Sequence, residues 1–175
     1  QSFPSVLLGK SYPGFPFGVV ETDSSLAIDR AVEDLPLKLS VAYLGQPVEA
    51  FYARHIGWFE SGCRKRGRTI TSMRHISCGF SQPAGAAAMQ ELLQAGSLPD
   101  LIIAEDDYVA CGALSVMATQ KKSTKLLTVG GFLKHLYPLD AHPVIDLNYR
   151  KIGRSAATLL LGALDGQQLY RTVLV

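Results

Sequence analysis

The sequence is short of several features that mark particular classes of protein. Its 175 residues include only three cysteines, Cys63, Cys78 and Cys111, and none of them lies in a Cys-x-x-Cys pair. Scattered cysteines in odd number favour buried, reduced thiols in a cytoplasmic protein over a disulfide framework. No apolar run approaches the roughly 18 residues that span a bilayer, so no membrane association is expected. The formal net charge of +2 gives no sign of nucleic-acid or membrane binding.

Catalytic and metal-binding patterns are missing as well. The four histidines, His55, His75, His135 and His142, show no metal-ligand spacing on one helix. The sequence has no Gly-x-Ser-x-Gly elbow, and no glycine-rich phosphate loop follows an expected strand. No nucleophile is expected to lie beside a base. The sequence therefore predicts a protein that is not an enzyme and that uses no cofactor or metal.

The start of the chain indicates a piece of a longer protein. Gln1-Ser2-Phe3-Pro4 is not a basic segment followed by an apolar one, so no secretory signal peptide is expected. The chain also lacks an initiator methionine and begins close to an apolar run, Val6-Leu7-Leu8.

Alternating strand and helix patterns run along most of the chain. Apolar runs predict strands, and residues at helical spacing predict helices between them; the strands are expected at 39–44, 71–77, 101–104 and 126–129, and the helices at 47–66, 84–94 and 108–120. Strands that alternate with helices of this length form a parallel sheet with right-handed crossovers. The predicted fold class is therefore α/β, with a Rossmann-like parallel-sheet lobe. Further elements are expected on either side: strands at 3–9 and 17–20, a helix from 26 that ends before Pro36, an extended segment at 144–147, a helix at 152–164 and a strand at 170–175.

Three adjacent acids, Glu105, Asp106 and Asp107, directly follow the apolar strand at 101–104. In an open α/β sheet, ligands bind at the carboxyl ends of the strands. We expect Asp107 to cap the following helix and to complement its dipole. Asp106 has no such structural role and would face the crevice, either as a ligand-binding carboxylate or as a solvated loop acid.

Arg54 and Phe80 are the other candidates at this edge. Arg54 lies early in the first long helix, where it can make a forked contact to a carboxylate, a phosphate or a sugar diol, or can be a surface arginine. Phe80 lies in a loop before a helix that Ser81 is expected to cap. Its ring can stack on a sugar or a base, or can belong to the core. The basic run at 64–68 is interpreted as a favourable helix C-terminus rather than a nucleic-acid contact.

Four segments of the chain carry a family resemblance. They are Pro4-Ser5-Val6-Leu7-Leu8-Gly9; Val41-Ala42-Tyr43-Leu44-Gly45 followed by Arg54-His55-Ile56-Gly57-Trp58; Pro99-Asp100-Leu101-Ile102-Ile103-Ala104-Glu105-Asp106-Asp107 continuing to Gly112-Ala113-Leu114; and Leu127-Thr128-Val129-Gly130-Gly131-Phe132 followed by Tyr149-Arg150-Lys151-Ile152-Gly153-Arg154. In this order and spacing they resemble the effector-binding domain of the lactose-repressor (LacI/GalR) family of bacterial transcription regulators. The family pattern for the third segment is Pro-Asp-Ala-Ile-Phe-Ala-Ala-Asn-Asp.

The resemblance implies a two-lobed fold like that of periplasmic sugar-binding proteins. Residues 1–18 would end the N-terminal lobe, and 19–146 would form the C-terminal, effector-binding lobe. Residues 147–167 would return as a helix to the N-terminal lobe, and 168–175 as a strand to the C-terminal lobe. The rest of the N-terminal lobe and a helix-turn-helix head would precede the chain.

The resemblance also implies roles for individual residues. Arg54 matches the family's effector-binding arginine, Phe80 matches its stacking aromatic, and Asp106 stands where the family commonly has Asn. Phe132 stands where many members have a ligand-binding Asp, and Leu147 stands where many have a polar residue, often Gln. These five residues form the expected effector site, and Gly9 replaces a further common Asp. The departures disfavour an ordinary hexose and favour a ligand with a flat or apolar part, or with an anionic group for Arg54.

By this resemblance, the chain would be the effector-sensing domain of a LacI-type regulator. It would bind a sugar or related metabolite between lobes, act as a homodimer through helices that include 108–120, and reach operator DNA through the helix-turn-helix. The alternative is a solute-binding protein of a transport system with the same fold. A helix-turn-helix upstream would select the first interpretation, and a signal peptide the second.

Overall fold

The computed structural model describes residues 4–9, 18–23, 25–46, 49–135, 139–166 and 172–174. The chain divides into two compact units. Gln1–Asp23 and Leu147–Val175 form the small unit, and Ser24–Asp146 form the large unit. In the part of the chain that is described, no helix is long and apolar enough to cross a membrane.

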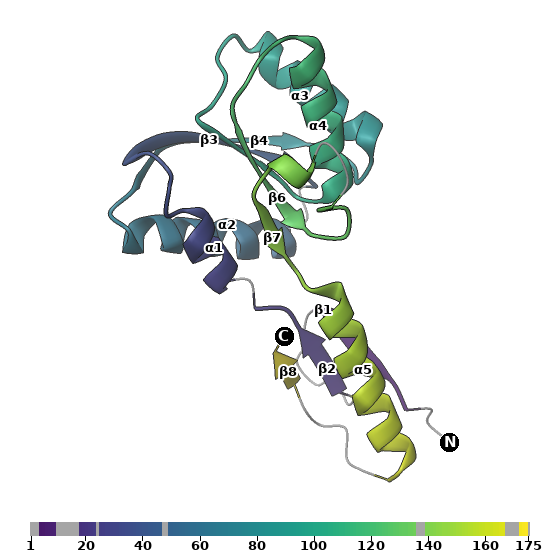
Figure 1. Ribbon diagram of the computed structural model, residues 1–175. Helices are drawn as coiled ribbons and strands as arrows, with labels where there is room; N and C mark the ends of the chain where they lie inside the picture. Colours follow the sequence, from purple (N-terminus) through teal and green to yellow (C-terminus); the bar gives the residue numbers. More distant parts are fainter. Residues whose placement is uncertain are drawn as a thin grey trace. The chain divides into compact units, whose positions relative to one another are not determined.

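A five-stranded parallel sheet forms the centre of the large unit (Figure 1). Its strands are β3 (Lys38–Gly45), β4 (Thr69–Ser77), β5 (Leu101–Ala104), β6 (Lys125–Gly130) and β7 (Val144–Asp146). The spatial order is β4-β3-β5-β6-β7, and each neighbouring pair is parallel. The predicted α/β class with a parallel sheet is therefore confirmed. The order reverses between β3 and β5, and such a switch point opens a crevice at the carboxyl ends of the strands.

Helices cover both faces of this sheet, which explains why its central strands are apolar throughout. The helices α3 (Gln82–Gln94) and α4 (Asp107–Thr119) lie on one face, and α1 (Ser25–Ala31) and α2 (Glu49–Lys65) lie on the other (Figure 1). All four residues of β5 are buried. A short 3-10 helix, η1 (Leu139–Ala141), precedes β7.

Small residues let α3 and α4 approach each other closely. A Cβ added to Gly85 would lie 2.7 Å from Val109 Cα, and one added to Gly112 would lie 2.6 Å from Ala86 N. Both contacts are with backbone, which cannot move aside as a flexible side chain can. Glycine at these two positions therefore sets how closely α3 and α4 pack, and this packing fixes where α4 begins.

The small unit contains a three-stranded parallel sheet and one long helix. The sheet order is β1 (Val6–Gly9), β2 (Gly18–Glu21), β8 (Thr172–Leu174), and the helix is α5 (Tyr149–Leu164). Because β8 pairs with β2, the expectation that the last strand returns to the larger lobe is wrong for Thr172–Leu174. The small unit also keeps the chain as far as Asp23, beyond the boundary expected at residue 18.

Candidate functional site

The carboxyl edge of the large sheet gathers three of the loops that the sequence singled out. They follow β3, β5 and β6, and they begin at Gln46, Glu105 and Gly131. The switch in strand order falls between β3 and β5, and open α/β sheets bind ligands at the carboxyl edge beside such a switch point.

Asp106 is the N-cap of α4. Its backbone is extended, with φ −147° and ψ 172°, and its Oδ1 accepts the Val109 N–H at 2.7 Å. The expectation that Asp107 caps this helix is therefore wrong, because Asp107 is already the first helical residue and its side chain points elsewhere. Burial raises the pKa of Asp106, and the charge of Asp107 also raises it, whereas hydrogen bonds from the Val109 and Tyr108 N–H groups lower it.

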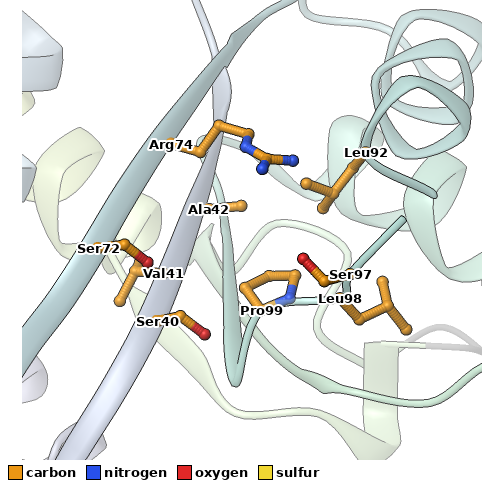
Figure 2. Close-up of a pocket in the computed structure, with 9 residues that line it drawn as sticks. All are labelled: Ser40, Val41, Ala42, Ser72, Arg74, Leu92, Ser97, Leu98 and Pro99. Atoms are coloured by element: carbon orange, nitrogen blue, oxygen red, sulfur yellow. The ribbon is translucent and has the colours of Figure 1, made fainter. Parts of the chain in front are cut away.

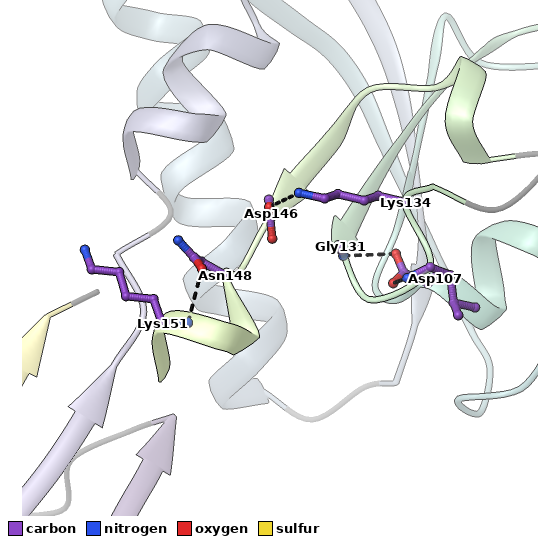
Figure 3. A network of polar contacts seen from close by, with 7 residues as sticks. Asp107, Gly131, Lys134, Asp146, Asn148 and Lys151 are labelled. Carbon is purple, nitrogen blue, oxygen red and sulfur yellow. Dashed lines mark hydrogen bonds and ion pairs between the residues drawn. The ribbon is translucent and has the colours of Figure 1, made fainter. Parts of the chain in front are cut away.

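Asp107 connects the start of α4 to the loop after β6. Its side chain is buried, with 4% exposure. Oδ1 accepts the Gly131 N–H at 3.2 Å, and Oδ2 accepts the Leu133 N–H at 2.8 Å; Figure 3 shows the first of these bonds. A Cβ on Gly130 would lie 2.7 Å from Asp107 Oδ1, so the loop backbone packs directly on the carboxylate. Asp107 thereby fixes the loop that carries Phe132.

Asp146 and Lys134 hold the same loop from its other side. Lys134 Nζ forms an ion pair with Asp146 Oδ2 (Figure 3). Gly131 has φ +99°, and a Cβ there would lie 2.5 Å from Asp146 Oδ1. The loop is thus bonded to carboxylates from two elements, and it presents Phe132 with 72% of its surface exposed.

Glu105 lies at the same edge, where the sequence placed it without indicating a role for it. It is buried, with 7% exposure, and its Oε2 accepts the Gln46 N–H at 2.5 Å. Burial raises the pKa of Glu105; the Gln46 N–H and Tyr43 oppose this rise, and the charge of Asp106 reinforces it. The signal was available in the sequence, because the family pattern has Ala at this position and this chain has an ionisable side chain.

The other expected site residues are less completely placed. Phe80 lies in the loop between β4 and α3 and is half-exposed at 50%, so it is not a core residue. The backbone of Arg54 belongs to α2, but its side chain lies outside the described part of the structure. Leu147 is partly buried and belongs to the small unit. The large unit therefore brings Asp106 to the same edge as the Phe132 loop, and the roles of all five residues stay predictions.

Two cavities lie at the opposite, amino edge of the sheet. One, of about 60 Å³, is lined by residues that include Ser40, Ser72 and Arg74 (Figure 2). The other, of about 660 Å³, is bordered by α1, by the starts of β5 and β6, and by the segment before β7. Neither cavity contains an expected effector residue. Among the described residues, no group of three or more His, Cys, Asp or Glu side chains could hold a metal ion.

The fold of this chain matches those of several solved structures. A LacI-family repressor from Corynebacterium glutamicum aligns with a TM-score of 0.79 and 16% identity, over 100% of this chain and 69% of its own. A LacI-family regulator from Enterococcus faecium, with bound ribose, aligns with a TM-score of 0.81 and 21% identity, over 98% of this chain and 66% of its own. A LacI-family regulator from Arthrobacter sp. FB24, in complex with lactose, aligns with a TM-score of 0.75 and 23% identity, over 97% of this chain and 66% of its own. The chain has the fold of LacI-family transcription regulators.

This likeness confirms the fold class that the sequence predicted, a parallel-sheet α/β fold of the LacI-family type. The chain spans about two-thirds of the length of these regulators. No family model matches the chain, and no curated protein matches it. The likeness therefore lies in the three-dimensional arrangement, at identities between 15% and 23%.

Proposed function

We propose that this chain is the effector-sensing part of a bacterial LacI-type transcription regulator. The observation that supports this most strongly is the likeness, over nearly the whole chain, to solved LacI-family regulators that include a ribose-bound and a lactose-bound member. The effector would bind at the carboxyl edge of the five-stranded sheet. Its binding would favour one of two states of a cytoplasmic homodimer, and so control operator binding by an N-terminal helix-turn-helix.

Five residues would hold the effector in this proposal. Arg54 would bind an anionic group or a diol, and Asp106 would accept hydrogen bonds from hydroxyl or amine groups. Phe80 and Phe132 would stack on a flat or apolar part of the ligand, which their exposure of 50% and 72% allows. Leu147 would add an apolar contact.

The ligand class follows from what these side chains can recognise. A simple hexose presents mainly hydroxyl groups, which Phe132 and Leu147 cannot bind by hydrogen bonds. A sugar or related metabolite that also carries an anionic group or a flat apolar part would satisfy both kinds of side chain.

A thermal-shift panel tests this proposal. The panel would contain ribose, lactose, simple hexoses, sugar phosphates and aromatic glycosides. A ligand at 100 times its Kd stabilises the folded state by about 2.7 kcal/mol, which is easily measured. We expect no shift with simple hexoses and a clear shift with an anionic or aromatic member. A clear shift with a simple hexose would contradict the assignment of Phe132 and Leu147.

A solute-binding protein of a transport system is the alternative with the same fold. The gene sequence upstream of Gln1 separates the two functions. A helix-turn-helix there supports the regulator, and a signal peptide supports the transport protein.

A further inference from the structure

Glu105 occupies the switch point of the sheet, where the strand order reverses. It follows β5 directly, and its own N–H donates to the Leu44 carbonyl near the end of β3 at 2.9 Å. Its side chain then crosses to the β3–α2 connection, where Oε2 accepts the Gln46 N–H at 2.5 Å. Backbone and side chain of this one residue therefore both bind the end of β3.

The contact is closely packed as well as hydrogen-bonded. Gly45 lies against the Glu105 side chain, and a Cβ on Gly45 would come within 2.7 Å of Glu105 Cβ. The Gly45 carbonyl is bonded on the other side, by the Cys78 N–H at 3.0 Å and the His75 ring Nε2 at 3.2 Å. The ends of β3, β4 and β5 thus meet around Glu105.

Other titratable groups face Glu105 from each neighbouring element. Tyr43, from β3, interacts with the carboxylate and lowers its pKa, and the Tyr43 ring meets the His75 ring of β4 edge to face, with centroids 5.6 Å apart. Asp106 lies next in the chain, and its charge repels that of Glu105. Burial raises the pKa of the Cys78 thiol, directly after β4, to about 11, and the charge of Glu105 adds to this rise. The side chains that open α2, residues 49–54, lie outside the described part of the structure.

We propose that Glu105 is a positioning residue for the effector edge: its carboxylate holds the Gln46 N–H and so fixes the chain where β3 ends, in a way that depends on its own proton. Ionised Glu105 forms a charge-assisted bond to Gln46, whereas protonated Glu105 forms a weaker neutral one. Arg54 lies on α2, which follows Gln46 in the chain, so in the proposed function this bond would help to position Arg54. The bond between Glu105 and Gln46 stands without the proposed function, and only its consequence for Arg54 rests on it.

Nuclear magnetic resonance of the Gln46 amide tests this inference without any ligand. In the wild-type chain, the Gln46 amide proton should move downfield as pH rises through the pKa of Glu105, because the bond becomes charge-assisted. In Glu105→Gln, the amide should stay protected from hydrogen exchange, since a neutral acceptor is retained, but its shift should no longer follow that titration. In Glu105→Ala, protection of the Gln46 amide should fall about tenfold or more.

Asp100→Asn is the matched control. Asp100 Oδ2 also accepts a backbone N–H, that of Ser40 at 2.7 Å, but at the amino edge of the same sheet. This variant should alter the Ser40 amide and leave the Gln46 titration unchanged. A Gln46 shift that titrates in Glu105→Gln as in wild type would overturn the inference, and that result decides the matter even if Glu105→Ala fails to fold. Absence of any effector would bear on the proposed function alone, because the Gln46 readout uses none.

Discussion

Exchanging each of two neighbouring aspartates for asparagine separates the two roles that the structure gives them. Asp106 caps α4, whereas Asp107 accepts the Gly131 and Leu133 N–H groups from inside the fold. The substitution changes no side-chain shape and removes one acceptor oxygen and the charge. Its effect should therefore be small at one position and large at the next.

The magnitudes follow from the partners of each carboxylate. At Asp107, the asparagine NH2 must face one of two backbone donors, so one bond is lost and a buried N–H is left without an acceptor. We expect a loss of about 2–4 kcal/mol in the free energy of unfolding. At Asp106, asparagine is as good an N-cap as aspartate, and the variant also removes a charge that burial disfavours. The expected change there is within about 0.5 kcal/mol.

Guanidinium unfolding measures both effects. Trp58 is the single tryptophan and lies on α2, so its fluorescence reports on the large unit. The midpoint should fall clearly for Asp107→Asn and hardly for Asp106→Asn, with similar slopes for both. A larger loss for Asp106→Asn would refute the assignment of the cap and of the loop contact together.

Three further predictions concern packing, pH and the effector. Gly112→Ala should lower the unfolding free energy by about 1–3 kcal/mol, because its Cβ would meet the backbone of α3. Gly57→Ala, where a Cβ meets nothing within 4 Å, should raise the unfolding free energy by about 0.5–1 kcal/mol in the same denaturation assay. Equal effects of the two variants would contradict the close α3–α4 contact. Burial raises the pKa of Glu105 and Asp106, so these two carboxyl groups bind more protons in the folded state than in the unfolded state, and their contribution to the unfolding free energy should fall as pH rises from about 4 through the raised values. Denaturation at several pH values should show a smaller fall in Glu105→Gln than in the wild-type chain. A pH profile in Glu105→Gln that matches the wild-type profile would contradict this prediction. Arg54→Ala should abolish the thermal shift from any effector that the panel identifies without lowering the basal Tm, and unchanged ligand binding would exclude a role for Arg54.

The elements of the large unit could be predicted because their signals are local. The expected strand at 101–104 coincides with β5, and the expected helix at 108–120 lies within one residue of α4 at both ends. Ser81 was expected to cap the next helix, and its hydroxyl accepts the Ala84 N–H at 3.2 Å. Each of these elements depends on apolar periodicity and on a capping residue within a few positions, which a sequence displays directly.

The start of α5 shows where this local reasoning falls short. The helix begins at Tyr149, three residues before the expected position, because Asn148 adopts a left-handed conformation with φ 53° and accepts the Lys151 N–H. The polar turn Tyr149-Arg150-Lys151 has no apolar residue to mark it as helical. A cap in an uncommon backbone conformation is hard to recognise without coordinates.

The two aspartates show a sharper limit. Aspartate is a good N-cap at either position, and moving the start of the helix by one residue exchanges the roles of the two aspartates. The partners that decide between them, Gly131 and Leu133, lie 24 and 26 residues further along the chain. No periodicity links these positions, because the bonds go from a side chain to backbone N–H groups in a loop. Sequence reasoning could therefore place the acids at the edge of the sheet but could not divide their functions.

The same limit explains why the structure changes the interpretation of the candidate site. The sequence suggested a run of surplus charge, of which Asp106 was to face the effector and Asp107 was to be structural. In the fold, each of the three acids has a backbone partner: Glu105 binds Gln46, Asp106 binds Val109, and Asp107 binds the loop of Phe132. Each carboxylate thus fixes a different loop or helix start at the carboxyl edge. An effector bound at this edge would contact groups that these carboxylates position, so substitutions in the acidic run should alter effector affinity even where the acid itself does not touch the ligand.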